Sequence, residues 1–485
     1  MKNIFKYINL LVITLILASC DNFLDVNNDP NNPTIINPEL VLPVAQKYTA
    51  NIIAGTDDGF RRANTLGNMM MYNWSQSDGY AWYPDEFKYL VTSSFYQDIF
   101  EDSYTQALKQ YQILTQLEGN YQNYKAIAMI MKAYHFQLLV DFYGDVPYSE
   151  ALLRKQNATP KYDDARAIYT NLLLQLTEAI NIIKNANNQI APGAEDIIFG
   201  GDMGKWIRFA NTIKLRIAVR ESNATEIAAI FAEGSGFITS DVLVNPGYEK
   251  NAGKQNPFWN LYGADEAGTP TLTNKATCAT DYILDYLEGT SDPRINFLYE
   301  KPSTGHLGVP QGLLDYDTPV VDAFIPENVS NIGPGLLKNE QMGACIFTLA
   351  ESYFNQAEAA LNQPSLGSAE IFYESGISAS FAYLGAPGAS TYYALPFNNV
   401  NYNSSSNKLE AIITQKWIAV NGITAEQSWF DYTRTGFPAN LPKSSQATSS
   451  DRPVRLFYPA SEFSSNGSNV PAQPNVFTAK IFWAN

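Results

Sequence analysis

The chain has 485 residues, a formal net charge of −16, three cysteines and two histidines. Such acidity disfavours nucleic acid and anionic lipid surfaces as partners. His135 and His306 lie far apart in the sequence, which argues against a histidine-built zinc site and most nucleophile arrangements that use histidine. Three cysteines leave no room for a disulfide framework. We expect neither a metal nor a cofactor.

The first residues have the organisation of a secretory signal peptide. Lys2 and Lys6 precede an apolar stretch at 10–17, which is too short to span a bilayer because a span needs about 20 apolar residues. The stretch runs into Leu-Ala-Ser-Cys at 17–20, which resembles the bacterial lipobox. We therefore predict a signal peptide over 1–19 and lipidation of Cys20, which would anchor the protein to a membrane. The alternative is an ordinary signal peptide with a chance cysteine.

Residues 20–45 are rich in Asn, Asp and Pro, a composition typical of an extended segment, and we predict a lipid-anchored tether there. The acids and amides at 25–31 alternate as in a calcium loop, but Pro30 stands where an EF-hand requires Gly.

The rest of the chain, 46–485, is predicted to form one mainly helical domain. Apolar residues at three- and four-residue spacing predict the following helices: 123–143, a second beginning near 163–164, 205–220, 341–361, 369–384 and 408–421. Such paired helices are similar to tetratricopeptide repeats, although no strict 34-residue period is present.

Three segments have a different composition. About 240–335, 385–407 and 436–485 are rich in Gly, Pro and Asn, with one short helix expected near 279–288. Long irregular segments in an ordered domain usually carry function. The prediction is a helical scaffold with a loop-rich lobe that carries the ligand face.

Six features resemble, in order, those of the SusD/RagB family of nutrient-binding outer-membrane lipoproteins. They are the Asn-, Asp- and Pro-rich start after Cys20, then Asp141–Tyr148, Trp206–Arg216, Asp292–Arg294, Glu351–Ala359 and a closing block of Gln415–Ile418 with Trp429–Pro438. The sequence departs from the family where Thr433 replaces the first of two arginines. The tryptophans of the starch-binding archetype also cannot be matched one by one, so the ligand is not carried over.

The resemblance implies a location and a role. It implies a SusD-like fold on the outer membrane of a Gram-negative bacterium, facing outward. It also implies capture of an oligosaccharide or polysaccharide and its delivery to a SusC-like TonB-dependent transporter, without catalysis. The motifs themselves are better explained by structure than by ligand binding: we expect Arg294 and Arg434 in buried ion pairs and Trp206 and Trp417 in the core.

The best candidate ligand site lies outside these motifs, at residues 72–83. Five aromatic residues alternate there with small polar ones, and aromatic faces with amide and carboxylate edges suit carbohydrate. We expect a loop with outward rings. The candidate ligand-binding residues are Asn73, Trp74, Gln76, Asp78, Tyr80 and Trp82, then Trp259 and Tyr262, with His306 and the pair Tyr392–Tyr393 as weaker candidates.

Two other functions remain open. The same fold binds peptides in RagB-like members, and the acidic charge leans slightly toward cationic peptides. A surface glycosidase is the third hypothesis, but no spacing of carboxylates singles out a catalytic pair, and no Gly-x-Ser-x-Gly elbow is present. The sequence therefore favours a binding protein over an enzyme.

Overall fold

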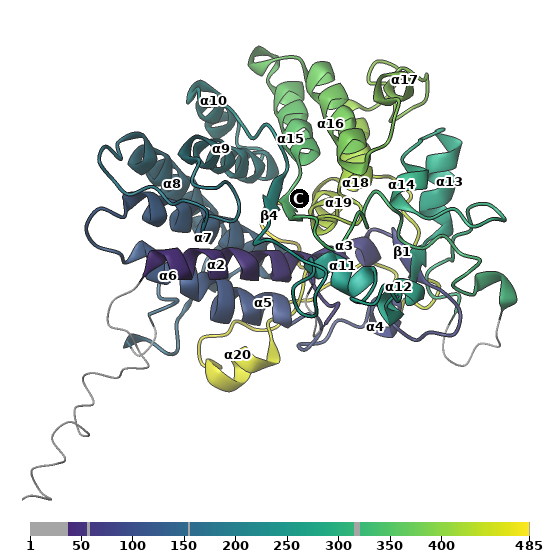
Figure 1. Ribbon diagram of the computed structural model, residues 1–485, viewed down its shortest axis with the longest axis horizontal. Helices are drawn as coiled ribbons and strands as arrows, with labels where there is room; N and C mark the ends of the chain where they lie inside the picture. Colours follow the sequence, from purple (N-terminus) through teal and green to yellow (C-terminus); the bar gives the residue numbers. More distant parts are fainter. Residues whose placement is uncertain (1–36, 56–58, 154–155, 315–320, 485) are drawn as a thin grey trace, which may run out of the picture.

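The computed structural model describes residues 37–55, 59–153, 156–314 and 321–484 (Figure 1). The predicted signal peptide and Cys20 lie outside the described residues. The longer helices are α2 (Pro38–Ala54), α3 (Ala63–Met70), α6 (Lys109–Thr115), α7 (Gln122–Tyr143), α8 (Ala165–Lys184), α9 (Met203–Arg220), α10 (Ala224–Ala232), α13 (Asp281–Gly289), α15 (Leu349–Asn362), α16 (Ala369–Leu384), α18 (Lys408–Val420) and α19 (Glu426–Thr435).

Short elements complete the fold. The short helices are α4 (Pro84–Lys88), α5 (Asp98–Asp102), the π-helix η1 (Ser103–Leu108), α11 (Pro257–Tyr262), α12 (Leu272–Ala276), α14 (Ile295–Leu298), η3 (Asp322–Phe324), η4 (Pro364–Leu366), α17 (Ala389–Tyr393) and α20 (Ala460–Ser465). The strands form three two-stranded antiparallel sheets: β1 (Trp74–Gln76) with β5 (Thr277–Ala279), β2 (Val146–Pro147) with β3 (Tyr162–Asp163), and β4 (Val242–Val244) with β6 (Ala344–Phe347).

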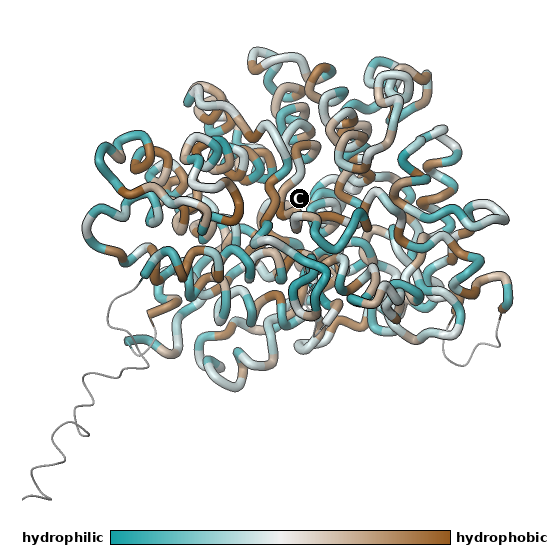
Figure 2. Tube along the Cα trace, in the orientation of Figure 1, coloured by the Kyte–Doolittle hydropathy of each residue, from teal (hydrophilic) through white to brown (hydrophobic). Residues whose placement is uncertain are grey.

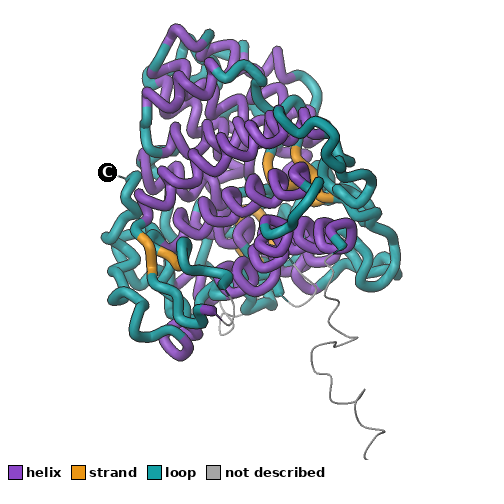
Figure 3. The backbone as a smooth tube through the Cα atoms, turned by 90° about the vertical axis from the view of Figure 1, so that its left-hand side faces the viewer, coloured by secondary structure: helices purple, strands orange, loops and turns teal. Residues whose placement is uncertain are grey.

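The scaffold is a stack of paired helices. Helix α8 packs against both α7 and α9, and α15 packs against α16 and α18 (Figures 1 and 3). The hydrophobic β4 strand lies near the centre of the molecule, where Figure 2 shows it in brown. The predicted mainly helical fold is confirmed. Trp206 and Trp417 are fully buried, as predicted.

Several helix boundaries follow local sequence signals. Asp164 caps α8 by accepting a hydrogen bond from the Ala167 backbone N–H at 2.9 Å, and Gly144 ends α7 with a φ of 77°. Among the described residues no helix is both long and apolar enough to cross a membrane.

The predicted tether is too long, because α2 already begins at Pro38. Asn37 caps this helix by accepting a hydrogen bond from the Glu39 backbone N–H at 3.0 Å, and Leu42 and Ala45 are fully buried. Asn followed by Pro is a helix start signal, and the Asn- and Pro-rich composition of the segment hid it.

The predicted helix at 341–361 begins too early. Residues 344–347 form strand β6, and α15 starts only at Leu349, after the Thr348 hydroxyl accepts from the Glu351 backbone N–H at 3.0 Å. Cys345 therefore lies in a strand, although it is buried as expected of a core residue. A four-residue apolar run does not distinguish a strand from a helix by periodicity.

The segment 240–335 contains more helix than expected. Its described part holds four α-helices, α11 to α14, and the 3-10 helix η3, where one short helix was predicted. In Figure 1 the four α-helices lie together with β1 on the right-hand side, away from α7 to α10. This arrangement forms a lobe of short elements and long connections.

The charged residues of the recognised motifs hold the scaffold together as buried ion pairs. Arg294 pairs with Asp292 at 2.6 Å and Arg434 with Glu358 at 2.6 Å, which confirms the role predicted for both arginines. Arg216 pairs with Glu351 at 3.4 Å and Lys416 with Asp431 at 2.8 Å. These motifs therefore define the scaffold and leave the ligand site to other residues.

Glu426, at the start of α19, gives the fold a pH dependence. It is fully buried, and burial raises the pKa of its carboxyl from 4.5 to about 7. The folded protein keeps this proton between these pH values, whereas the unfolded chain releases it. The contribution to stability is therefore fully present below pH 4.5 and is lost as the pH rises through about 7; such a shift corresponds to about 3 kcal/mol.

Glu426→Gln should remove this dependence. We expect the variant to match the wild type at pH 5 and to exceed its free energy of unfolding at pH 8, as measured by urea denaturation. Glu178→Gln, which changes an exposed carboxylate on α8, is the control and should shift neither value. An equal difference between the Glu426 variant and the wild type at both pH values would contradict the assignment.

Candidate functional site

The predicted aromatic segment at 72–83 is partly core. Strand β1 pairs with β5, with Trp74 opposite Ala279 and Gln76 opposite Thr277. Trp74 is fully buried, and its ring lies 5.0 Å from that of Tyr262, which is also fully buried. Our expectation of an outward ring is therefore wrong for Trp74, because strand pairing buries the start of the segment. Tyr262, a second candidate, is a core residue of α11.

The polar residues of the segment are also buried and engaged. Asn73 is fully buried, and its amide donates to Asn68 Oδ1 at 3.1 Å. Gln76 Oε1 accepts from the backbone N–H of Trp82 at 3.0 Å, and Gln76 Nε2 donates to the Tyr80 carbonyl at 2.9 Å. Gln76 thus fixes the loop that follows, and neither side chain is placed to bind a ligand hydroxyl as we expected.

Asp78 joins two loops. Its carboxylate accepts from the backbone N–H groups of Gly79, at 2.7 Å, and of Val321, and its own N–H donates to the Phe324 carbonyl at 2.8 Å. Because its oxygens are used in this way and it is only 5% exposed, Asp78 positions residues 79–83 and is not a ligand contact.

The loop held by Gln76 and Asp78 presents a group of three aromatic rings, which we call the aromatic cluster: Phe60, Tyr80 and Trp82. All three are half-buried. Phe60 and Trp82 stack with ring centroids 6.0 Å apart and an interplanar angle of 26°, and Tyr80 meets Trp82 edge-on at 6.2 Å. The cluster leaves part of each ring open to solvent, as stacking on a sugar face requires.

Sequence reasoning did not find Phe60. It is a single aromatic residue in the short connection between α2 and α3, so neither spacing nor composition marks it. Arg61 lies over its ring at 5.6 Å and forms an ion pair with Asp85 at 3.2 Å. Arg61 is half-exposed and adds a hydrogen-bond donor beside the cluster.

A cavity of about 450 Å³, which we call the lobe pocket, lies among the short elements of the lobe. It is lined by Trp259, Gly263, Ala264, Pro270, Asn274, Lys275, Glu300, Lys301, Pro302, Pro326, Glu327, Val329, Asn331, Pro334 and Leu337. Its volume falls in the usual range for small-molecule sites. The charged residues of its wall include both signs.

One hydrogen bond and one electrostatic interaction link the segment that carries the aromatic cluster to the wall of the lobe pocket. The Ser77 hydroxyl donates to the backbone carbonyl of Lys275 at 2.6 Å, just before the loop that carries the cluster. Burial, and then the nearby carboxylate of Glu327, raises the pKa of Tyr80. Ser77 and Tyr80 therefore connect the segment that carries the cluster to two residues of the pocket wall, Lys275 and Glu327.

The weaker candidates fall elsewhere or are already engaged. Both ring nitrogens of half-buried His306 lie within hydrogen-bond distance of protein oxygens, Ser330 Oγ at 3.0 Å and Asn296 Oδ1 at 3.1 Å. Desolvation lowers its pKa, so the ring is neutral near pH 7. Tyr392 is a core residue whose ring packs against Phe381. Neither residue lines the lobe pocket.

The structure thus combines a scaffold of paired helices with a lobe of short elements that carries the candidate site. Over residues 30–459 the sequence matches the SusD-like family model described as starch-binding and associating with the outer membrane. The chain belongs to the SusD-like family.

Solved structures agree with this assignment. A chitin-binding protein superposes with a TM-score of 0.74 at 25% identity, over 93% of this chain and 100% of its own. A chitin-binding SusD homologue from Flavobacterium johnsoniae gives 0.74 at 20% identity, covering 91% and 98%. A SusD homologue from Bacteroides vulgatus gives 0.75 at 21% identity, covering 91% and 97%. A comparison of the sequence with curated proteins gives no match.

Proposed function

We propose that this protein binds an oligosaccharide at the outer face of the outer membrane and delivers it to a SusC-like TonB-dependent transporter. The observation that carries the proposal is the half-exposed aromatic cluster of Phe60, Tyr80 and Trp82, in a fold that also holds the lobe pocket lined by Trp259. Ring faces stack on the apolar faces of pyranose rings, and the polar pocket wall supplies groups that hydrogen-bond hydroxyls.

The first glycans to test are chitooligosaccharides. Two similar solved structures are described as chitin-binding. Isothermal titration should give a micromolar-to-millimolar Kd, about −4 to −8 kcal/mol, because a ligand that is passed on must also be released. Malto-oligosaccharides and a cationic peptide mixture are the comparison ligands. Binding of the peptides alone would overturn the glycan proposal.

A binding role without catalysis is part of the proposal. Glu300 and Glu327 both line the lobe pocket, and a glycosidase would need two carboxylates across the bound sugar. Incubation with each glycan that binds should release no reducing sugar. If the wild type released reducing sugar, and Glu300→Gln or Glu327→Gln abolished that release, the protein would be an enzyme and the binding-only proposal would be wrong.

Lipid anchoring through Cys20 is also proposed. Cys20→Ser should release the mature protein from the membrane fraction while its glycan affinity stays that of the wild type, since the ligand surface lies in the folded domain. Fractionation of cells that lack the transporter checks this, with Ser19→Ala as the control that keeps the cysteine. If the Cys20 variant remains in the membrane, the lipid anchor is wrong.

A further inference from the structure

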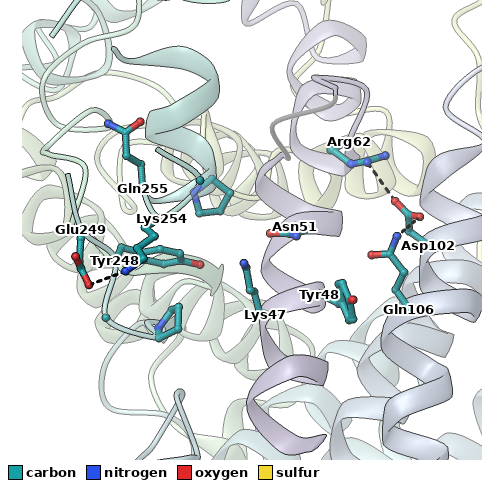
Figure 4. A pocket seen from close by; sticks show the side chains of 14 residues that line it. Lys47, Tyr48, Asn51, Arg62, Asp102, Gln106, Tyr248, Glu249, Lys254 and Gln255 are labelled. Atoms are coloured by element: carbon teal, nitrogen blue, oxygen red, sulfur yellow. Dashed lines mark hydrogen bonds and ion pairs between the residues drawn. The ribbon is translucent and has the colours of Figure 1, made fainter. Parts of the chain in front are cut away.

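A second cavity, which we call the α2 pocket, lies over helix α2 and has a volume of about 530 Å³ (Figure 4). It is lined by Lys47, Tyr48, Asn51, Arg62, Asp102, Gln106, Pro246, Gly247, Tyr248, Glu249, Gly253, Lys254, Gln255 and Pro257. It shares no lining residue with the lobe pocket or the aromatic cluster. It is therefore a separate site.

One wall of the α2 pocket holds polar groups that have no protein partner. Tyr248 is only 7% exposed, yet its hydroxyl makes no hydrogen bond within the described part of the chain. Figure 4 shows this hydroxyl pointing toward α2 on the side where Lys47 lies, with Asn51 one turn further along the helix. A buried hydroxyl without a partner costs free energy unless a ligand or water supplies one.

Lys47 is the one lysine or arginine of the pocket lining for which no ion pair is found among the described residues. No hydrogen bond or ion pair joins its ammonium group to a described residue, whereas Lys254 pairs with Glu249 at 3.7 Å and Arg62 pairs with Asp98 and Asp102, each at 3.1 Å. The pocket wall carries three cations and two carboxylates, in a chain of net charge −16. The pocket is thus locally suited to an anion.

The opposite wall comes from an irregular helix. Gln106 lies in the π-helix η1, and its amide donates to Asp102 Oδ1 at 2.7 Å. π-helical turns are rare and often occur at functional sites. Tyr48, on α2 itself, lies on the side of that helix toward Gln106 (Figure 4), so this side of the pocket offers an amide edge and an aromatic ring.

We propose that the α2 pocket binds a carboxylate-bearing sugar, such as a hexuronate. The carboxylate would lie between the Lys47 ammonium and the Tyr248 hydroxyl, which donates to it. The ring hydroxyls would bond the side-chain amides of Asn51 and Gln106. Lys47 is exposed, so its ammonium group can reach an anion in the pocket; an uncharged sugar would make no ion pair with it, and a simple inorganic anion would leave most of the cavity unfilled.

The test measures binding of D-glucuronate and of D-glucose, its uncharged match, to the intact protein by ligand-observed NMR titration. We expect glucuronate to bind at least tenfold more tightly than glucose and to weaken as ionic strength rises. Lys47→Gln and Tyr248→Phe should each weaken glucuronate binding about tenfold. Lys205→Gln, which changes an exposed lysine on α9, should have no effect.

The result also separates the two sites. Trp82→Ala should leave glucuronate binding unchanged, and Lys47→Gln should leave chitooligosaccharide binding unchanged. Absence of glucuronate binding at millimolar concentration, equal binding of glucose, or equal binding by the Lys47 and Tyr248 variants would each overturn the proposal. Tyr248→Phe removes one oxygen only, and a urea midpoint close to that of the wild type establishes that it is folded.

Discussion

Replacing Trp82 with Ala should weaken binding of the glycan about thirtyfold and leave the fold intact. The indole stacks on Phe60 at 6.0 Å and packs against the core on one side, but it is only half-buried, so part of it remains open to a sugar ring. A central aromatic anchor of this kind contributes about 2 kcal/mol to binding. Isothermal titration with the oligosaccharide that the wild type binds best measures the change.

Two control variants, one of a buried tryptophan and one of a distant tyrosine, show whether the loss of affinity is specific to Trp82. Trp74→Ala, eight residues earlier, removes a fully buried ring and should lower the free energy of unfolding by about 3–5 kcal/mol. Tyr393→Ala removes a half-buried ring on α17, far along the chain from the cluster, and should change neither affinity nor stability by much. Unchanged affinity in Trp82→Ala would place the glycan elsewhere on the protein.

Asp292→Ala should be among the most destabilising single substitutions. Asp292 and Arg294 have no exposed side-chain surface, and their ion pair at 2.6 Å is supported by a hydrogen bond from Arg294 to Gln415 Oε1 at 2.6 Å. Removing the carboxylate leaves a buried guanidinium without a counter-charge, which costs about 3–5 kcal/mol. That is a large part of the 5–15 kcal/mol that keeps a typical domain folded. Urea denaturation measures the loss.

The matched variants distinguish charge burial from lost volume. Lys161→Ala breaks an exposed pair with Glu150 at 3.2 Å and should hardly move the urea midpoint. The double variant Asp292→Ala, Arg294→Met removes both charges and should recover most of the lost stability, because no unpaired charge remains. If Asp292→Ala behaved like Lys161→Ala, the pair would not hold α13 and α14 to the scaffold.

Local patterns predicted the scaffold well. Helix α16 runs over the predicted 369–384, and α18 ends one residue before the predicted boundary. Strong three- and four-residue periodicity and capping residues such as Asp164 act within a few residues, so they can be read from a sequence. The same reasoning missed β6, because strand pairing with β4 depends on a segment 100 residues earlier.

At the candidate site, too, local sequence patterns identified some residues, whereas others could be recognised only from the tertiary structure. Residues 72–83 were recognised by composition alone, yet Trp74 pairs into a sheet and Trp82 does not, and composition treats the two alike. Phe60 joined the cluster only through the packing of a distant connection. The α2 pocket was not predicted, because its lining comes from α2, the connection to α3, α5 with η1, and the chain at 246–257, separate segments with no shared motif.

The sequence alone determined the helical class, the order of the family motifs and the type of side chain at each candidate position, since periodicity, capping and composition are local properties. The tertiary structure decided which of those side chains are buried. In the folded protein Asn73, Trp74 and Tyr262 are buried, whereas Tyr80 and Trp82 remain half-exposed. The side chains of Gln76 and Asp78 form hydrogen bonds that hold a loop. The physical reason is that burial depends on partners brought together from distant parts of the chain, and pairing of β1 with β5 is what separates the two tryptophans.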